Sequence, residues 1–106
     1  MPKTYFRFCA VVWLYPGAQA AWHFVTIPET ISATIKKTFG AQAKGWGSIA
    51  VETTIGKTTW KTSIFPDRKR NAYILPLKAA VREKEDIAKG EQIKVCLQII
   101  RMEEKL

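Results

Sequence analysis

Hydrophobic and polar residues alternate over several short runs of the chain, which is the pattern of β-strands with one buried face. From residue 5 to residue 15 one alternating set is apolar and is expected to face the core: Phe6, Phe8, Ala10, Val12 and Leu14. Pro16-Gly17 is typical of a turn. A return strand is predicted over residues 20 to 27, with Trp22 and Phe24 on its core face. The two runs therefore predict an antiparallel hairpin.

Three further alternating runs follow. Residues 48 to 55 and 58 to 65 predict a second hairpin, in which Trp60 faces the core. Gly56-Lys57 joins them, and glycine at the first central position suits a type II′ turn. Residues 92 to 101 alternate as a last strand, whose inward set is Ile93, Val95, Leu97 and Ile99.

One unit of the pattern occurs twice. An extended run that ends in an aliphatic residue and proline precedes a short helical pattern, first at residues 25 to 31 and again at residues 73 to 79. Pro28 and Pro76 are expected to open the two helices, because a first helical residue does not need its N–H. Ile31, Ile35 and Phe39 form one apolar stripe, and Gly40 is expected to end the first helix.

Strands in hairpins with two short helices are not compatible with a doubly wound sheet. Closing the strands into a small barrel removes exposed edges, and the helices can cap its ends. We therefore predict an all-β fold with two short helices. The expected architecture is a closed, pseudo-duplicated double-split barrel of about six to seven strands that forms one domain over residues 1 to 106.

Composition adds one anomaly to this picture, which is charge. The chain has 17 Lys and Arg against 9 Asp and Glu, a formal net charge of +8. Such a surplus favours anionic partners, nucleic acid first and a membrane surface second, although a basic surface also serves solubility alone. No run is apolar and long enough to cross a bilayer, so we expect a cytoplasmic protein with no membrane partner, working as a monomer or weak homodimer. Cys9 and Cys96 are expected to be free thiols.

The basic residues of the second half supply a candidate nucleic-acid surface. The run at residues 68 to 70 is the sharpest local signal, and residues of the second hairpin and second helix could extend it into one positive face. The alternative is a solvated turn that begins at Asp67. The proposed set is Arg68, Lys69, Arg70, Lys57, Lys61, Lys78 and Arg82.

Trp46 is a candidate for stacking on a ligand ring or a base. It lies between Gly45 and Gly47 in a predicted loop, where glycines leave an aromatic side chain exposed. The alternative is that Trp46 plugs one end of the barrel. The other tryptophans fall in strands.

No catalytic or metal site is indicated. His23 is the only histidine, and no Ser or Cys in an elbow motif accompanies it, so a structural or surface role is expected. Gly56-Lys57-Thr58 is not a phosphate loop, because Val51 stands where the first glycine is required. The acidic residues at 83, 85 and 86 alternate with Lys84 and its basic neighbours as a solvated face. We therefore expect a protein that is not an enzyme and carries no cofactor or metal.

Several segments, in their order along the chain, resemble a known bacterial and archaeal family. They are Trp22 to Pro28, Gly45 to Val51, Phe65-Pro66, Ile74 to Arg82, and Gly90 to Val95. Together they are similar to the domains of unknown function numbered nineteen hundred and five, over nearly the whole chain. The resemblance implies a double-split β-barrel, the architecture of the swapped-hairpin DNA-binding domains of the AbrB and MazE type, with both halves in one chain.

Two departures limit what the resemblance implies. The family usually has Gly-Asp where this chain has Gly90-Glu91, and the AbrB-type arginine sits nearer the proline than Arg82 does. The resemblance therefore carries the fold and no DNA-contact residue. Two functions stay open: a binding module for nucleic acid, and a small-ligand or bacteriocin-protection type of stress domain that uses a barrel groove near Trp46.

Overall fold

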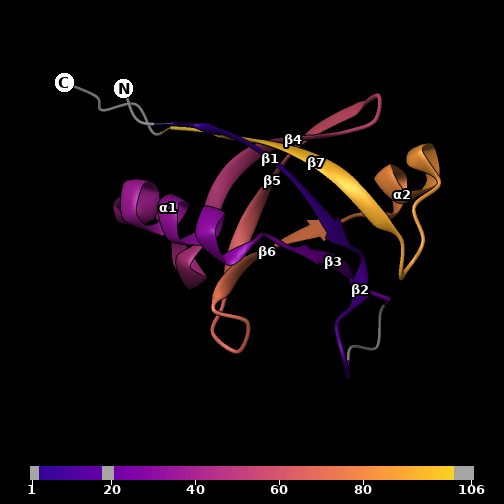
Figure 1. Ribbon diagram of the computed structural model, residues 1–106, viewed down its shortest axis with the longest axis horizontal. Coiled ribbons are helices and arrows are strands. Elements are labelled where there is room, and N and C mark those ends of the chain that lie inside the picture. The colour runs from indigo at the N-terminus through magenta and orange to yellow at the C-terminus, as the bar shows by residue number, and fades with distance from the viewer. Residues whose placement is uncertain (1–2, 18–20, 102–106) are drawn as a thin grey trace.

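A computed structural model describes residues 3–17 and 21–101 of the chain (Figure 1). Residue 20, the expected start of the return strand, and residues 102–106 lie outside the described ranges. The strands are β1 (Tyr5–Val11), β2 (Trp13–Leu14), β3 (His23–Thr26), β4 (Ile49–Ile55), β5 (Thr58–Asp67), β6 (Ala72–Leu77) and β7 (Gln92–Ile99). The helices are α1 (Glu29–Phe39) and α2 (Ala79–Glu85), with short 3₁₀ turns η1 (Gly40–Gln42) and η2 (Gly45–Gly47).

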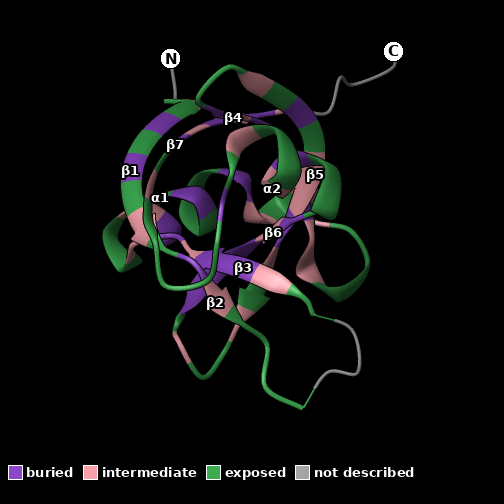
Figure 2. Ribbon diagram, turned by 90° about the vertical axis from the view of Figure 1, so that its right-hand side faces the viewer, coloured by how far each residue is buried: buried purple, intermediate pink, exposed green. Residues whose placement is uncertain are grey.

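The strands form one antiparallel sheet in the order β1-β7-β4-β5-β6-β3-β2. The sheet curls into a half-barrel (Figure 1), and Figure 2 shows buried and exposed residues alternating along β1. β1 and β2 stand at opposite ends of this order, yet only Val12 separates them in the chain. The mostly β fold with two short helices is therefore confirmed, whereas complete closure of the barrel stays a prediction.

The core follows the predicted alternation closely. Phe6, Phe8 and Val12 are buried on the β1 side, and Val95, Leu97 and Ile99 are buried on β7. Trp60 of β5 is also in the core. The β4–β5 hairpin has the predicted turn, since Ile55 pairs with Thr58. Local pattern and packing therefore agree for most of the sheet.

The first predicted hairpin is largely wrong. β1 pairs with β7 along its whole length, and only Trp13 and Leu14 pair with the return strand, opposite Phe24 and His23. The chain bends at Val12, whose N–H and C=O bond to Glu91 and Gly90 beside β7. Beyond the bend the alternation changes sides. Leu14 is therefore exposed rather than inward. On the return strand Phe24 is buried as predicted, whereas Trp22 is exposed because it lies outside β3, which begins at His23.

The prolines also differ in position from the prediction. Pro28 is the N-cap residue of α1, so the helix begins at Glu29. Pro76 lies inside β6 rather than at the start of α2, which begins at Ala79. β6 tolerates proline there because its pairing with β5 covers only residues 72 to 74, so the ladder on that side has already ended.

The doubled unit appears in the pairing register of β3 and β6. Val25 lies opposite Leu75, and the Ile27 N–H donates to the carbonyl of Tyr73. Val25 and Tyr73 each lie three residues before the proline of their unit. Ile27 and Leu75 each lie directly before it. Each unit therefore pairs with the other in an equivalent way, as two halves related by an approximate two-fold axis do.

Candidate binding groove

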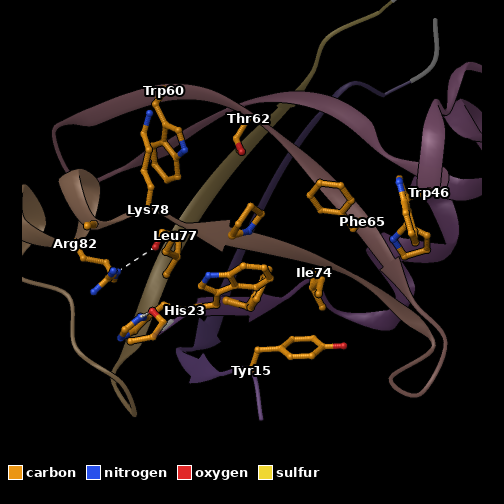
Figure 3. A pocket seen from close by; sticks show the side chains of 16 residues that line it. Tyr15, His23, Trp46, Trp60, Thr62, Phe65, Ile74, Leu77, Lys78 and Arg82 are labelled. Atoms are coloured by element: carbon orange, nitrogen blue, oxygen red, sulfur yellow. Dashed lines mark hydrogen bonds between the residues drawn. The ribbon is translucent and has the colours of Figure 1, made fainter. Parts of the chain in front are cut away.

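A groove of about 960 Å³ opens where β5 separates from β6 (Figure 3). β5 pairs with β6 only through residues 65 to 67, and its earlier residues pair with β4 instead. Trp60 and Thr62 of β5 therefore line one side, while Pro76 and Leu77 of β6 line the other. The strand that changes partners thus leaves a split in the sheet that side chains only partly fill.

The walls of the groove are mainly aromatic. Six aromatic side chains besides His23 line it: Tyr15, Trp22, Phe24, Trp46, Trp60 and Phe65. Trp60 and Phe24 are buried, whereas Trp22 is 59% exposed and Trp46 is 93% exposed. Rings of this kind present flat apolar faces that favour a flat apolar ligand.

Trp46 is held at one end of the groove by its backbone. It adopts a left-handed conformation with φ of 66° inside η2, and Gly47 follows with φ of 76°. A Cβ on Gly47 would meet Cγ of Pro66 at 2.8 Å, so only glycine lets this turn approach β5 so closely. The expected exposure of Trp46 is confirmed, and its contact with a ligand stays a prediction.

The charged residues of the groove are both cations. Lys78 and Arg82 line it at the α2 end, and no Asp or Glu stands among its described lining residues. Lys78 is the N-cap residue of α2 and Arg82 lies within this helix, and both side chains line the groove. The Arg82 Nε–H donates to the carbonyl of Leu77 at 3.0 Å, which orients the guanidinium (Figure 3).

His23 lies at the same end of the groove (Figure 3). Its Nδ1 is 2.7 Å from the carbonyl oxygen of Ala21 and donates to it, because a carbonyl can only accept. The ring is half-buried. No hydrogen bond joins it to an acidic side chain in the part of the chain that the structure describes, so no orienting acid for catalysis is present there.

The structure divides the predicted basic surface into separate groups. Lys57 lies on the exposed β4–β5 turn, which contacts α2 through the hydrogen bond from Thr58 to Glu85. Lys61 is exposed on the outer face of β5, opposite Glu52. The run at residues 68 to 70 forms the β5–β6 turn at the other end of β5. Of the predicted set, only Lys78 and Arg82 line one common groove, and the run at residues 68 to 70 lies apart from them.

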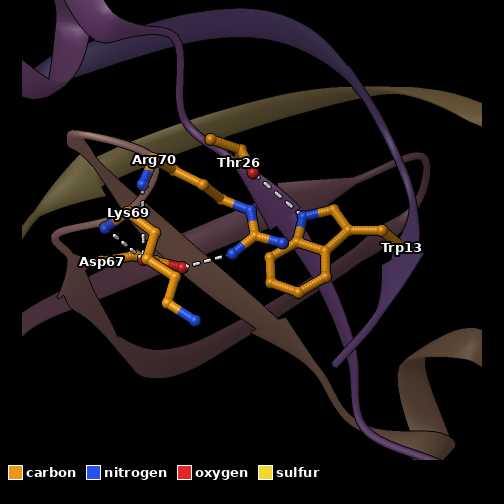
Figure 4. A network of polar contacts seen from close by, with 5 residues as sticks. All are labelled: Trp13, Thr26, Asp67, Lys69 and Arg70. Atoms are coloured by element: carbon orange, nitrogen blue, oxygen red, sulfur yellow. Dashed lines mark hydrogen bonds and ion pairs between the residues drawn. The ribbon is translucent and has the colours of Figure 1, made fainter. Parts of the chain in front are cut away.

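Arg70 differs from its two neighbours in that turn (Figure 4). It pairs with Oδ2 of Asp67 at 2.6 Å, and its guanidinium carbon lies 3.7 Å from the centre of the Trp13 ring. The Trp13 Nε1–H donates to Thr26 at 2.9 Å. Arg70 therefore holds the turn against β2 and β3, while Arg68 and Lys69 are exposed.

Other expectations concerned reactive groups. Cys9 and Cys96 are free, as predicted. Within residues 3–17 and 21–101 there is no group of three His, Cys, Asp or Glu that could hold a metal ion. No helix in those ranges is long and apolar enough to cross a membrane.

Sequence reasoning found Trp46, Lys78 and Arg82 but did not place them in one groove. It also missed Tyr15, Trp22 and Phe65 as lining residues, because alternation assigned Trp22 to the core. The available signal was the density of aromatic residues around Pro16-Gly17, where Trp13, Tyr15, Trp22 and Phe24 stand close together in the chain.

No curated protein matches the chain in a sequence comparison. A family comparison does match, over residues 8–97, which include all of the strands but the start of β1 and the end of β7. The matched part also contains the whole groove. The chain therefore belongs to the family described as Domain of unknown function (DUF1905).

Proposed function

We propose that the protein is a non-enzymatic binding module that holds a small ligand with a flat, apolar body in the aromatic groove. The observation that carries the proposal is a groove of about 960 Å³ walled by six aromatic side chains. Small-molecule sites have volumes of about 300 to 1,000 Å³ and mostly apolar linings with a few polar groups. This groove has that character.

The exposure of the aromatic residues supports the proposal. Isolated apolar residues on a surface need no explanation, but a contiguous group indicates an interaction site. Tyr15, Trp22 and Trp46 are each more than 40% exposed and line the same groove. The floor is formed by strands, so little order has to be created when a ligand binds.

The proposal is tested with a neutral, flat probe such as N-phenyl-1-naphthylamine, followed by fluorescence. We expect saturable binding, weakened about tenfold in Trp46→Ala and in Trp22→Ala, because stacking on one aromatic ring contributes about 1 to 3 kcal/mol. Tyr5→Ala is the matched control, since Tyr5 is also an exposed aromatic residue but lies outside the groove. Absence of saturable binding, or equal weakening by Tyr5→Ala, would show that the proposal is wrong.

Nucleic acid is a second candidate, favoured by Arg68 and Lys69, whose exposed side chains accompany a net charge of +8. The test is binding to single-stranded DNA of random sequence over a range of salt concentrations. We expect the slope of log affinity against log salt to fall in size by about 1.4 in Arg68→Ala/Lys69→Ala, at about 0.7 for each phosphate contact. Arg70 is left intact because it stabilises the turn. An unchanged slope in the double variant would show that Arg68 and Lys69 do not contact phosphates. If the wild type does not bind DNA at 50 mM salt, nucleic acid is not the ligand.

We also propose that the half-barrel is a closed double-split barrel, related in fold to the AbrB-type domains. The proposal is supported by the short connection between β1 and β2. These strands stand at the two ends of the sheet order, yet only Val12 lies between them in the chain, so the two edges of the sheet come close together. The equivalent register of the two repeats is consistent with that architecture.

A further inference from the structure

We propose that the ligand of the groove is an aromatic organic anion, whose carboxylate or phosphate is bound by Lys78 and Arg82 while its ring lies against the aromatic wall. This inference rests on the proposed function and adds the chemical class and the orientation of the ligand.

The charge of the groove carries the first step. The described residues that line it include two cations and no acidic side chain. A ligand that buries these cations without bringing a negative charge would leave them desolvated and unpaired, which costs free energy. An anionic group compensates both cations, so charge complementarity selects an anion over a neutral or cationic ligand.

Neither cation forms an ion pair with an acidic residue of the described ranges, 3–17 and 21–101. In the part of the chain that the structure describes, the one ion pair joins Arg70 to Asp67. The acidic residues of α2 are directed elsewhere. Glu85 accepts a hydrogen bond from Thr58 at 2.6 Å, and Glu83 is exposed and outside the groove lining. Lys78 and Arg82 therefore keep their charges available to a ligand.

Arg82 is also preoriented for such a ligand. Its Nε–H is held by the Leu77 carbonyl, and this leaves the two terminal nitrogens to bind an anion. Guanidinium nitrogens match the oxygen spacing of carboxylate and phosphate groups, and Lys78 adds a mobile point charge beside them. Less side-chain entropy is then lost when the anion binds.

The residues around Lys78 and Arg82 strengthen the attraction of these cations for an anion and determine which way the ligand lies in the groove. Leu77 and Trp60 are buried beside them, and apolar walls of low dielectric increase the field in a cleft. Trp46 lies at the opposite end of the groove (Figure 3). The anionic group is therefore placed at the α2 end and the ring toward Trp46.

The test uses three probes that share one ring system: 2-naphthoate, the neutral 2-naphthamide and 2-naphthyl phosphate. Dissociation constants are measured by titration calorimetry for the wild type, Lys78→Gln, and Lys78→Gln/Arg82→Gln. Lys84→Gln is the matched control, because Lys84 is an exposed cation of the same helix outside the groove lining. Thermal unfolding of each variant verifies that it is folded. If the double variant does not fold, Lys78→Gln alone decides the test.

We expect the wild type to bind 2-naphthoate at least tenfold more tightly than 2-naphthamide, since hydrogen bonds to charged groups contribute about 1.5 to 3 kcal/mol. The preference should shrink severalfold in Lys78→Gln and disappear in the double variant, with amide binding unchanged, and should persist in Lys84→Gln. Tighter binding of the phosphate ester than of 2-naphthoate supports a phosphate ligand, and the reverse order supports a carboxylic acid.

Two other outcomes separate the inference from the proposed function. Equal binding of 2-naphthoate and 2-naphthamide to the wild type, or an acid preference that survives in Lys78→Gln and the double variant, would overturn the inference and leave the groove as a binding site. Failure of all three probes and of the neutral probe above would overturn both.

Discussion

The guanidinium carbon of Arg70 lies 3.7 Å from the centre of the Trp13 ring, within the range of a cation–π contact (Figure 4). The same guanidinium pairs with Asp67, whose other oxygen accepts the Lys69 N–H at 3.0 Å. Arg70 thus joins the β5–β6 turn to β2 by one side chain. Its charge serves the fold, so the basic run cannot be treated as three equivalent contacts to phosphate.

The first prediction follows from this contact. Arg70→Ala should lower the free energy of unfolding by about 1 to 3 kcal/mol, because it removes the cation–π contact and the ion pair to Oδ2 of Asp67. Lys69→Ala, which changes an exposed neighbour, should remain within about 0.5 kcal/mol of the wild type. Urea denaturation measures both, and similar values for the two variants would contradict the role given to Arg70.

The second prediction concerns Ser32, a buried polar residue that connects α1 to both repeats. Its Oγ donates to the Ile27 carbonyl and accepts from the Tyr73 N–H, each at 3.0 Å. Ser32→Ala should reduce the free energy of unfolding by about 1 to 3 kcal/mol, because the buried Tyr73 N–H loses its partner.

A matched control for Ser32 lies on the same helix. Thr34 is exposed and its hydroxyl donates to the Thr30 carbonyl within α1. Thr34→Ala should be neutral or slightly stabilising, since alanine has the higher helix propensity. Chemical denaturation of the two variants would contradict the prediction if Ser32→Ala were no more destabilising than Thr34→Ala.

The sequence predicts the parts of this fold that depend on neighbouring residues. Gly56-Lys57 joins strands that are adjacent in the chain, and their alternation places Trp60 inside, as observed. The pairing of β1 with β7 joins residues about 90 positions apart, such as Tyr5 and Gln98. The alternation along one strand does not determine which distant strand pairs with it. Strand existence was therefore predictable, whereas this pairing was not.

The candidate site shows the same limit. Trp46 was predicted to be exposed because glycines flank it, and Lys78 and Arg82 were recognised as cations of one helix face. Their common groove depends on β5 changing partners from β4 to β6, which is a property of the whole sheet. Trp22 was assigned to the core because alternation distinguishes two faces of a strand but does not show that one of them ends at a groove.

A third prediction addresses the contact between the β4–β5 turn and α2. Gly56 has a φ of 58°, and a Cβ at this position would run into the Glu85 carboxylate. Gly56→Ala should therefore destabilise the protein by about 1 to 3 kcal/mol, from left-handed backbone strain together with the clash. Lys57→Ala, at the next residue of the turn, should be nearly neutral.

A double-mutant cycle separates the two causes. In a Glu85→Ala background the clash is absent, so Gly56→Ala should cost only the backbone part, about 1 kcal/mol. Glu85→Ala alone loses the hydrogen bond from Thr58 and should also be destabilising. Equal effects of Gly56→Ala in both backgrounds would show that Glu85 does not restrict this position.

The last prediction is a dependence of stability on pH that originates at Tyr73. Burial raises the pKa of Tyr73 above its ordinary value of 10.0. In the unfolded chain this phenol loses its proton near pH 10, whereas in the folded protein it keeps the proton to a higher pH. Ionisation then stabilises the unfolded state alone, so the contribution of Tyr73 to stability is complete below pH 10 and is lost as pH rises through the folded-state pKa.

Tyr73→Phe lacks this ionisation and isolates its effect, because the lysines titrate alike in both proteins. The difference in unfolding free energy, wild type minus Tyr73→Phe, should be constant between about pH 7 and pH 9. Above about pH 10 it should fall by up to about 1.4 kcal/mol for each pH unit until the folded phenol also ionises. Urea denaturation at each pH gives the unfolding free energies of the two proteins. A difference for Tyr73→Phe that stays constant to pH 11 would mean that this phenol ionises alike in the folded and unfolded chains.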